Sequence, residues 1–97
     1  MSTYVLLMNL TDKGVQEIKD APERIGNAVK DLEAAGGKLL SFYTVMGAYD
    51  YVAAVEAPSD EVALAQLLGL GMAGFVRTTT LKAFTVQQLA EALKKLP

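Results

Sequence analysis

The sequence predicts one α+β domain, spanning residues 1–97, in which strands and helices follow the order βαββαβ and a further helix ends the chain. Three observations predict this fold. Apolar, β-branched runs alternate with segments of helical periodicity, a tight polar turn separates two strand-like runs, and the length suffices for a single core.

The first half of the chain predicts a strand followed by a helix in two pieces. The run Thr3–Leu10 is β-branched, aromatic or long aliphatic, and Thr11 then offers a helix N-cap. We expect a break at Asp20-Ala21-Pro22-Glu23, because the two acids have the spacing of a capping box and the proline suits a first turn. Gly36-Gly37 ends the helix.

The second half predicts a hairpin, a helix, a strand and a terminal helix. Ser59 is the expected N-cap of the helix, which carries no charge after its first turn and must be covered on more than one side. The expected elements are strands at Lys38–Met46 and from Asp50 or Tyr51 to Glu56, a helix to Met72, a strand at Phe75–Phe84, and an amphipathic helix at Val86–Leu96.

Both faces of the predicted sheet are mainly apolar, since Val5 and Leu7 alternate with Leu6 and Met8 in the first strand. The crossover helices cover one face, and the other exceeds the apolar surface that monomers usually expose. We therefore predict a ferredoxin-like domain that pairs sheet to sheet as a homodimer or higher homo-oligomer, forming a dimeric α/β barrel. The alternative is a C-terminal helix folded over the open face.

Composition excludes several function classes. Hydrophobic residues make up 52% of the chain, yet charges and glycines interrupt every run long enough to suggest a membrane span. There is no cysteine or histidine, so thiolate chemistry and the commonest metal ligand are missing, and we expect no metal and no cofactor. The net charge of −2 and scattered basic residues argue against nucleic acid. Without a secretory signal pattern at its start, the protein is expected in the cytoplasm.

One glycine motif resembles a dinucleotide fingerprint. Gly69-Leu70-Gly71-Met72-Ala73-Gly74 fits G-x-G-x-x-G, but the glycines close a helix and lead into a strand. A phosphate would then face the carbonyl end of that helix. We predict no nucleotide site, and expect instead that Gly69 and Gly71 let the helix pack close to the sheet while Gly74 makes the turn.

Five polar residues are the candidate ligand contacts: Asn9, Tyr43, Tyr49, Asp50 and Arg77. Asp50 is expected to accept backbone N–H bonds that fix the chain reversal. The tyrosines are expected to seal a subunit interface, with the lining of a pocket as the alternative. Arg77 lies in a strand of Phe, Val and Thr, so it needs a carboxylate partner, for which the sequence offers Asp50 and Glu56, or a ligand anion at the barrel mouth. We assign no catalytic residue.

The chain resembles the GYD domain family, named for a Gly-x-Tyr-Asp turn that appears here as Gly47-Ala48-Tyr49-Asp50. The resemblance covers nearly the whole chain, including Tyr4-Val5-Leu6-Leu7, Leu10-Thr11-Asp12-Lys13-Gly14, Ile18-Lys19-Asp20-Ala21-Pro22, Val55-Glu56-Ala57-Pro58 and Val76-Arg77-Thr78-Thr79-Thr80-Leu81. It implies a ferredoxin-like dimeric α/β barrel and no established activity.

Two other groups share parts of this pattern. A similar hairpin occurs in the effector-binding domains of leucine-responsive regulators, which bind amino acids between subunits, but this chain lacks their helix-turn-helix. Cofactor-independent monooxygenases share the barrel, which is a likeness of fold alone. The leading hypothesis is a non-catalytic, self-associating module that binds a small molecule at or near the dimer interface. The alternatives are a cofactor-free enzyme of the monooxygenase-like type using an interior Tyr or Asp, and a purely structural oligomer.

Overall fold

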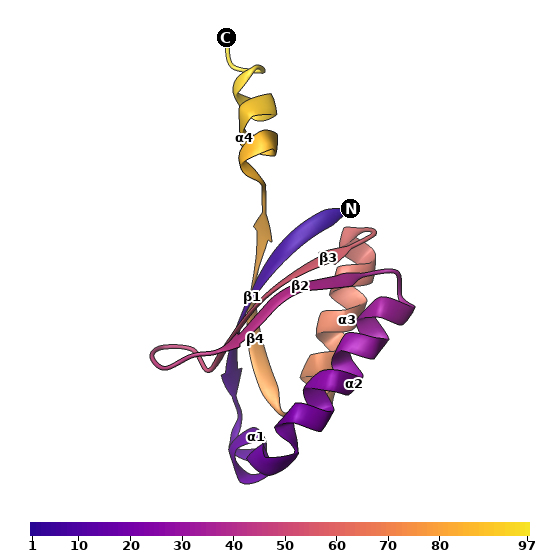
Figure 1. Ribbon diagram of the computed structural model, residues 1–97, viewed down its shortest axis with the longest axis vertical. Coiled ribbons are helices and arrows are strands. Elements are labelled where there is room, and N and C mark those ends of the chain that lie inside the picture. Colours follow the sequence, from indigo (N-terminus) through magenta and orange to yellow (C-terminus); the bar gives the residue numbers. More distant parts are fainter.

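The computed structural model describes residues 1–97 and contains a four-stranded sheet with helices on one of its faces (Figure 1). The elements, in chain order, are β1 (Ser2–Leu10), α1 (Asp12–Gln16), the 3-10 helix η1 (Ile18–Asp20), α2 (Ala21–Ala34), β2 (Lys38–Thr44), β3 (Tyr51–Ala57), α3 (Asp60–Ala73), β4 (Val76–Ala83) and α4 (Val86–Leu93). No helix has both the length and the apolar character needed to cross a membrane.

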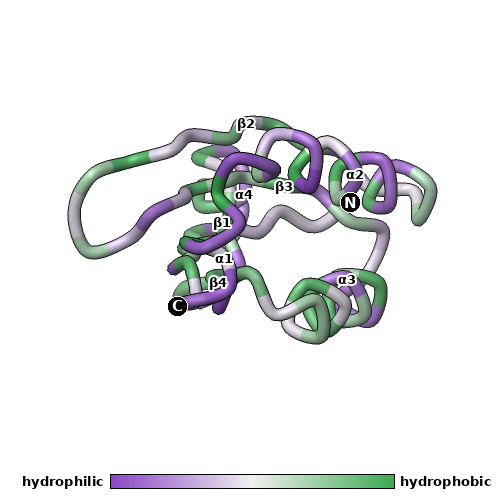
Figure 2. Tube along the Cα trace, turned by 90° about the horizontal axis from the view of Figure 1, so that it is seen from below, coloured by the Kyte–Doolittle hydropathy of each residue, from purple (hydrophilic) through white to green (hydrophobic).

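The sheet has the strand order β2-β3-β1-β4, and each neighbouring pair is antiparallel. In the central ladders Val5 lies opposite Ala54 on one side and opposite Leu81 on the other. Helices α2 and α3 both lie on one side of this sheet (Figure 2). The predicted α+β fold with the order βαββαβ is therefore confirmed, and the predicted strands are correct to within two residues at each of their ends.

Local signals set most helix ends. The side chain of Thr11 accepts from the backbone N–H of Gly14, and that of Ser59 accepts from Val62. Gly74 closes α3 in the left-handed conformation at φ +83°. The predicted break before α2 is present, but Asp20 makes no side-chain capping bond, so the expected capping box is wrong. The 3-10 turn η1 makes the break instead.

The core lies between the helices and the sheet. Its buried side chains come from the helix-facing positions of the strands and from one residue each on α2 and α3: Tyr4, Leu6, Met8, Tyr51, Ala53, Val55, Ala57, Leu32 and Ala63. Only 11 of 97 residues are buried, which shows that the helices leave part of the sheet uncovered.

The expectation that Gly69 and Gly71 allow close packing of α3 on the sheet is wrong. A Cβ atom added at either glycine would meet no atom within 4 Å. The physical reason is that the two positions face space that no strand fills. The outer side chains Leu64, Leu68 and Met72 of the same helix are likewise exposed.

Helix α4 continues beyond the end of β4 and projects away from both layers (Figure 1). Every residue from Phe84 to Pro97 is exposed, including Val86 at 83% and Phe84 at 70%. A capping box of Thr85 and Gln88 fixes its start. The alternative in which this helix covers the open face of the sheet is therefore not the arrangement that the chain adopts.

Candidate functional site

The face of the sheet opposite the helices has no helix packed against it (Figure 2). Because directly opposed residues point to the same side, the strand registers place Val5, Leu7, Val52, Ala54 and Leu81 together at its centre. Leu81 is 48% exposed. No helix of the chain lies against these side chains (Figures 1 and 2). The open face is thus an apolar strip with nothing from its own chain to cover it.

Three of the five candidate contacts belong to this open face. Asn9 on β1 lies directly opposite Arg77 on β4, so the structure brings these two together at one end of the strip. Tyr43, on β2, lies opposite Val52 and is 65% exposed. Since β3 separates β2 from β1, Tyr43 is on the same face as Asn9 but two strands away.

The remaining two candidates, Tyr49 and Asp50, lie in the β2–β3 turn, which projects beyond the sheet on the side away from the helices (Figures 1 and 2). The Asp50 carboxylate accepts a 2.8 Å hydrogen bond from the backbone N–H of Leu10, and the Asp50 N–H donates to the carbonyl of Met8 at 2.9 Å. Asp50 does accept a backbone N–H, as expected, but the donor lies on β1. The side chain therefore fastens the turn to the neighbouring strand.

The expected ion pair of Arg77 is wrong. The guanidinium donates to the carbonyls of Gly71 at 3.3 Å and Val76 at 3.1 Å, and the ion pairs of the structure are Lys82–Asp60 and Lys94–Glu91. β4 is an edge strand, so a long side chain can reach round to the end of α3. The last carbonyls of a helix lack partners and carry partial negative charge, which attracts a cation.

We expect Arg77→Ala to lower the melting temperature by a few degrees. The reason is the loss of hydrogen bonds to carbonyls at an exposed helix end, which contribute at most about 1 kcal/mol. Arg77→Lys keeps the charge, so its melting temperature should lie between those of the wild type and the alanine variant. Thermal unfolding at one fixed protein concentration provides the measurement. A melting temperature identical to that of the wild type in the alanine variant would show that these bonds add nothing to stability.

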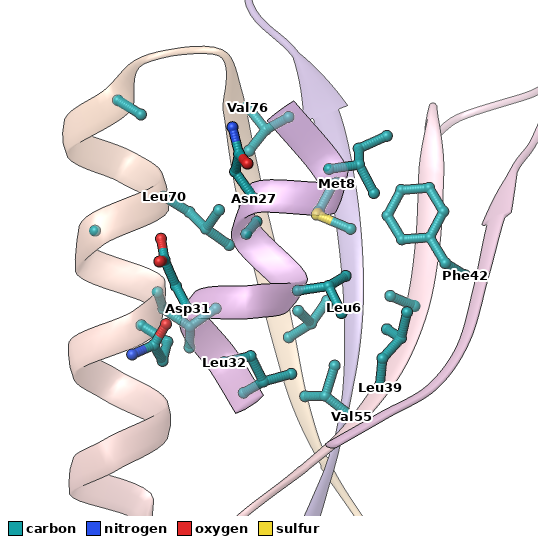
Figure 3. A pocket seen from close by; sticks show the side chains of 18 of the residues that line it. Leu6, Met8, Asn27, Asp31, Leu32, Leu39, Phe42, Val55, Leu70 and Val76 are labelled. Atoms are coloured by element: carbon teal, nitrogen blue, oxygen red, sulfur yellow. The ribbon is translucent and has the colours of Figure 1, made fainter. Parts of the chain in front are cut away.

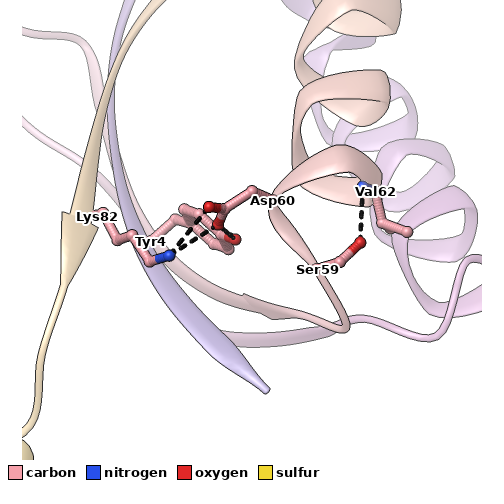
Figure 4. A network of polar contacts seen from close by, with 5 residues as sticks. All are labelled: Tyr4, Ser59, Asp60, Val62 and Lys82. Atoms are coloured by element: carbon pink, nitrogen blue, oxygen red, sulfur yellow. Dashed lines mark hydrogen bonds and ion pairs between the residues drawn. The ribbon is translucent and has the colours of Figure 1, made fainter.

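A second polar cluster lies on the helix side, where Tyr4, Asp60 and Lys82 meet (Figure 4). The Tyr4 hydroxyl donates to Asp60, and Lys82 donates to both carboxylate oxygens at 3.0 Å. Tyr4 and Lys82 are register partners on β1 and β4, and Asp60 begins α3. Sequence reasoning missed this cluster, although strand alternation places Tyr4 and Lys82 on one face once the β1–β4 pairing is known.

The electrostatics of this cluster suit a structural role. The hydrogen bond to Asp60 and burial raise the pKa of Tyr4, and the hydrogen bonds from Tyr4 and Lys82 lower the pKa of Asp60. The bond to the carboxylate likewise raises the pKa of Lys82. A general acid or base works best with a pKa near neutrality. All three shifts move away from that range, so the cluster holds β1, β4 and the start of α3 together.

The pH dependence of stability should report this cluster. Because the pKa of Asp60 is lowered on folding, its contribution is present above the unfolded pKa of about 4 and is lost as pH falls through the folded value. The raised pKa of Lys82 makes its contribution disappear as pH rises through the folded value above about 10.5. We expect Asp60→Asn to have a lower melting temperature than the wild type at neutral pH and an equal one near pH 2.

The matched control for this experiment is Glu61→Gln, which removes from the same helical turn a carboxylate that makes no hydrogen bond to the cluster and acts on the pKa of Lys82 only weakly, through its charge. The difference in melting temperature between Glu61→Gln and the wild type should vary less with pH than the difference for Asp60→Asn. If the melting-temperature difference between Asp60→Asn and the wild type stayed constant from pH 2 to neutrality, the ionised Asp60 carboxylate would not be the source of the stabilisation.

A cavity of about 780 Å³ lies between α2, α3 and the sheet. None of the five candidate contacts lines it, and sequence reasoning did not anticipate it. No cluster of acidic side chains lies close enough together to hold a metal ion. The structure therefore offers two separate places for a partner, namely the open face and this cavity on the opposite side of the sheet.

The fold and the open face define a small α+β domain with one unpartnered sheet surface. The family model described as "GYD domain" matches residues 4–93, and the chain belongs to this family. It is similar to a Thermus thermophilus protein named "Glutamine synthetase and cystathionine beta-lyase binding protein", with 37% identity over 97% of this chain and 100% of the relative. It also resembles the crystal structure of TTHA0845, likewise from Thermus thermophilus, with a TM-score of 0.59 and 28% identity over 89% of this chain and 96% of that chain.

Proposed function

We propose that the protein is a non-catalytic interaction module in which two copies associate open face to open face. The observation that carries the proposal is the apolar strip around Val5, Leu7 and Val52, which α4 leaves bare. Pairing two such faces would form a dimeric α/β barrel and remove both strips from water. The family membership supports an interaction module, since a relative is named as a binding protein.

The size of the open face is adequate for a stable dimer. Four strands about 4.8 Å apart, with about seven paired residues each at about 3.3 Å per residue, cover about 400 Å² of sheet. About half of this face is apolar, since Thr3, Asn9 and Thr79 share it with the apolar strip. At about 25 cal/mol per Å² of apolar surface, the two faces together contribute on the order of 10 kcal/mol before the cost of association is subtracted. A mass measurement by sedimentation equilibrium tests this step, and we expect a dimer or a multiple of it.

The name of the Thermus thermophilus relative suggests what such a dimer binds. We propose that this protein also docks on metabolic enzymes, with glutamine synthetase and cystathionine β-lyase as the first to test. Helix α4 is suited to the contact, because Val86, Leu89 and Leu93 recur on one side and are exposed. A helix of eight residues is marginal alone in water, so it gains stability from a partner.

The docking step has a direct test. Purified enzymes of the same host are mixed with the protein, and binding is measured by calorimetry. We expect at least one of them to bind, and Leu89→Glu with Leu93→Glu to weaken that binding while the dimer mass is unchanged. Absence of binding by both enzymes would reject this partner class and leave self-association to be judged by its own measurement.

A small molecule held between the two sheets is the second candidate function. The observation that favours it is the register pairing of Asn9 with Arg77, whose backbones lie side by side at the end of the open face. To bind a ligand there, the guanidinium would exchange its carbonyl partners on Gly71 and Val76 for the ligand. Tyr43 would line the same space, with Tyr49 and Asp50 at its rim. Native mass spectrometry of protein purified from its host tests the proposal: an added mass lost in Arg77→Ala supports it, and a bare dimer contradicts it.

A cofactor-free enzyme is the weaker alternative. Such a reaction needs an interior acid or base with a pKa near neutrality. The tyrosine whose pKa is displaced is Tyr4, and its pKa is raised by Asp60. The arrangement therefore favours binding over catalysis.

A further inference from the structure

We infer that the cavity between α2, α3 and the sheet is a binding site for a small apolar molecule that ends in an amine or a hydroxyl group. This site lies on the opposite side of the sheet from the proposed dimer interface, so its test is independent of the test of the proposed function. Figure 3 shows the cavity from close by.

The chemistry of the lining is the first support. Of the 29 residues that line the cavity, 24 are hydrophobic, and Leu6 and Met8 of β1 form part of its floor. Leu32 of α2 and Leu70 of α3 stand on either side (Figure 3). Ligand sites in proteins typically measure about 300–1,000 Å³ and combine apolar walls with a few polar groups. The volume of about 780 Å³ falls within that range.

The cavity exists because the helices present small side chains to it. Ala28 and Ala34 of α2 and Ala63, Gly69 and Ala73 of α3 all line the space, where leucines would have filled it. An added Cβ at Gly69 would meet no atom within 4 Å. The space is open to solvent between the two helices, so it is a cleft and not an enclosed void. An apolar cleft of this extent is unfavourable in water, and a ligand that fills it removes its walls from solvent.

The polar groups at the cavity determine the head group. Asn27 and Asp31 lie one turn apart on α2, with side chains that are drawn at the α3 side of the helix in Figure 3. Gln66 of α3 also lines the cavity. Arg24 also lines the cavity and keeps its charge, but its guanidinium is held at the other end of α2, where it donates to the Glu17 carbonyl at 2.8 Å and lies over the Phe75 ring at 4.0 Å. Asp31 lies seven residues further along the helix, about 10 Å away, so its own charge dominates near Asn27. The Asp31 carboxylate makes no ion pair within the chain. It therefore attracts a donor or a cation and repels a carboxylate.

Three probes of equal shape test the site: 4-phenylbutylamine, 4-phenylbutanol and 4-phenylbutyrate. Binding is measured by NMR titration of the uniformly labelled protein. We expect the amine and the alcohol to shift the amide signals of cavity residues on α2 and α3, and the amine to bind at least about tenfold more tightly than the carboxylate. Failure of the amine and the alcohol to bind, or equal binding of all three probes, would overturn the inference.

A matched pair of variants locates the binding. Gly69 and Gly71 lie on the same helix and both have open space around an added Cβ, but only Gly69 lines the cavity. We expect Gly69→Leu to abolish amine binding and Gly71→Leu to preserve it, with the melting temperature confirming that both variants fold. If Gly69→Leu does not fold, Gly69→Ala replaces it and should weaken binding. Retained wild-type affinity in a folded Gly69 variant would show that the probe binds elsewhere.

Two further measurements separate this site from the others. Asp31→Asn should bring the affinity for 4-phenylbutylamine down to that for the alcohol, whereas an unchanged preference for the amine would overturn the role of Asp31. Binding should persist in a variant that no longer dimerises, because the cavity is on the helix side of the sheet. Loss of binding together with the dimer would show that the probe binds between subunits.

Discussion

We expect Leu7→Glu to convert the proposed dimer to a monomer. Leu7 lies in the middle of β1 on the open face, opposite Val52 and Thr79. In a single copy a carboxylate there remains in contact with water, so the domain should still fold. In a face-to-face dimer the same charge is buried without a partner, which costs several kcal/mol or more. The apparent dissociation constant should therefore rise by at least about a thousandfold.

The control for this prediction uses the other large apolar surface. Leu68→Glu places the same charge on the outer side of α3, where Leu68 is 59% exposed. We expect this variant to remain dimeric in sedimentation equilibrium. The reverse pattern, with Leu68→Glu monomeric and Leu7→Glu dimeric, would move the interface to α3. If both variants remained dimeric, neither the open face nor the outer side of α3 would be needed for association.

The sequence was sufficient for the order and type of the elements, because their signals are local. Thr11, Ser59 and Gly74 act through bonds or backbone conformations within a few residues, and each lies where the structure uses it. The apolar character of both sheet faces follows from alternation along single strands in the same way. These features need no knowledge of which segments meet in space.

The contacts of the site could not be predicted, because they depend on pairings that are distant in the sequence. Arg77 was assigned a carboxylate partner, yet its position on an edge strand lets it reach the end of α3. Tyr4 and Lys82 meet only through the β1–β4 register. Whether Gly69 marks close packing or empty space depends on the distance of α3 from the sheet, which no local pattern encodes.

Helix α4 also shows the difference between features that local sequence determines and features that depend on distant contacts. Its amphipathic pattern predicted a helix, and the helix is present. The pattern does not say what the apolar side covers. In the structure that side remains exposed, which leaves both the open face of the sheet and the helix itself available to partners. The high hydrophobic content of the chain, 52%, is therefore explained in part by the apolar residues on these two surfaces.

The substitution Gly14→Ala is expected to be the most destabilising single change that adds only one methyl group. Gly14 is buried at the start of α1, and an added Cβ would overlap the carbonyl oxygen of Phe75 and lie 2.9 Å from Leu10 Cδ2. The carbonyl cannot move aside without loss, because it accepts a 3.0 Å hydrogen bond from the N–H of Thr11. We expect a loss of about 2–4 kcal/mol, which lowers the melting temperature by at least about 10 °C.

Gly26→Ala provides the matched comparison, since Gly26 lies within α2 and an added Cβ there meets no atom within 4 Å. Alanine is the better helix former, so this variant should gain about 0.5–1 kcal/mol. Thermal unfolding of the two variants thus distinguishes a steric effect from a helix-propensity effect of the same substitution. If Gly14→Ala also proved more stable than the wild type, the close contact between α1 and the residue that precedes β4 would be wrong. The position of α3, which ends at that junction, would then have to be revised as well.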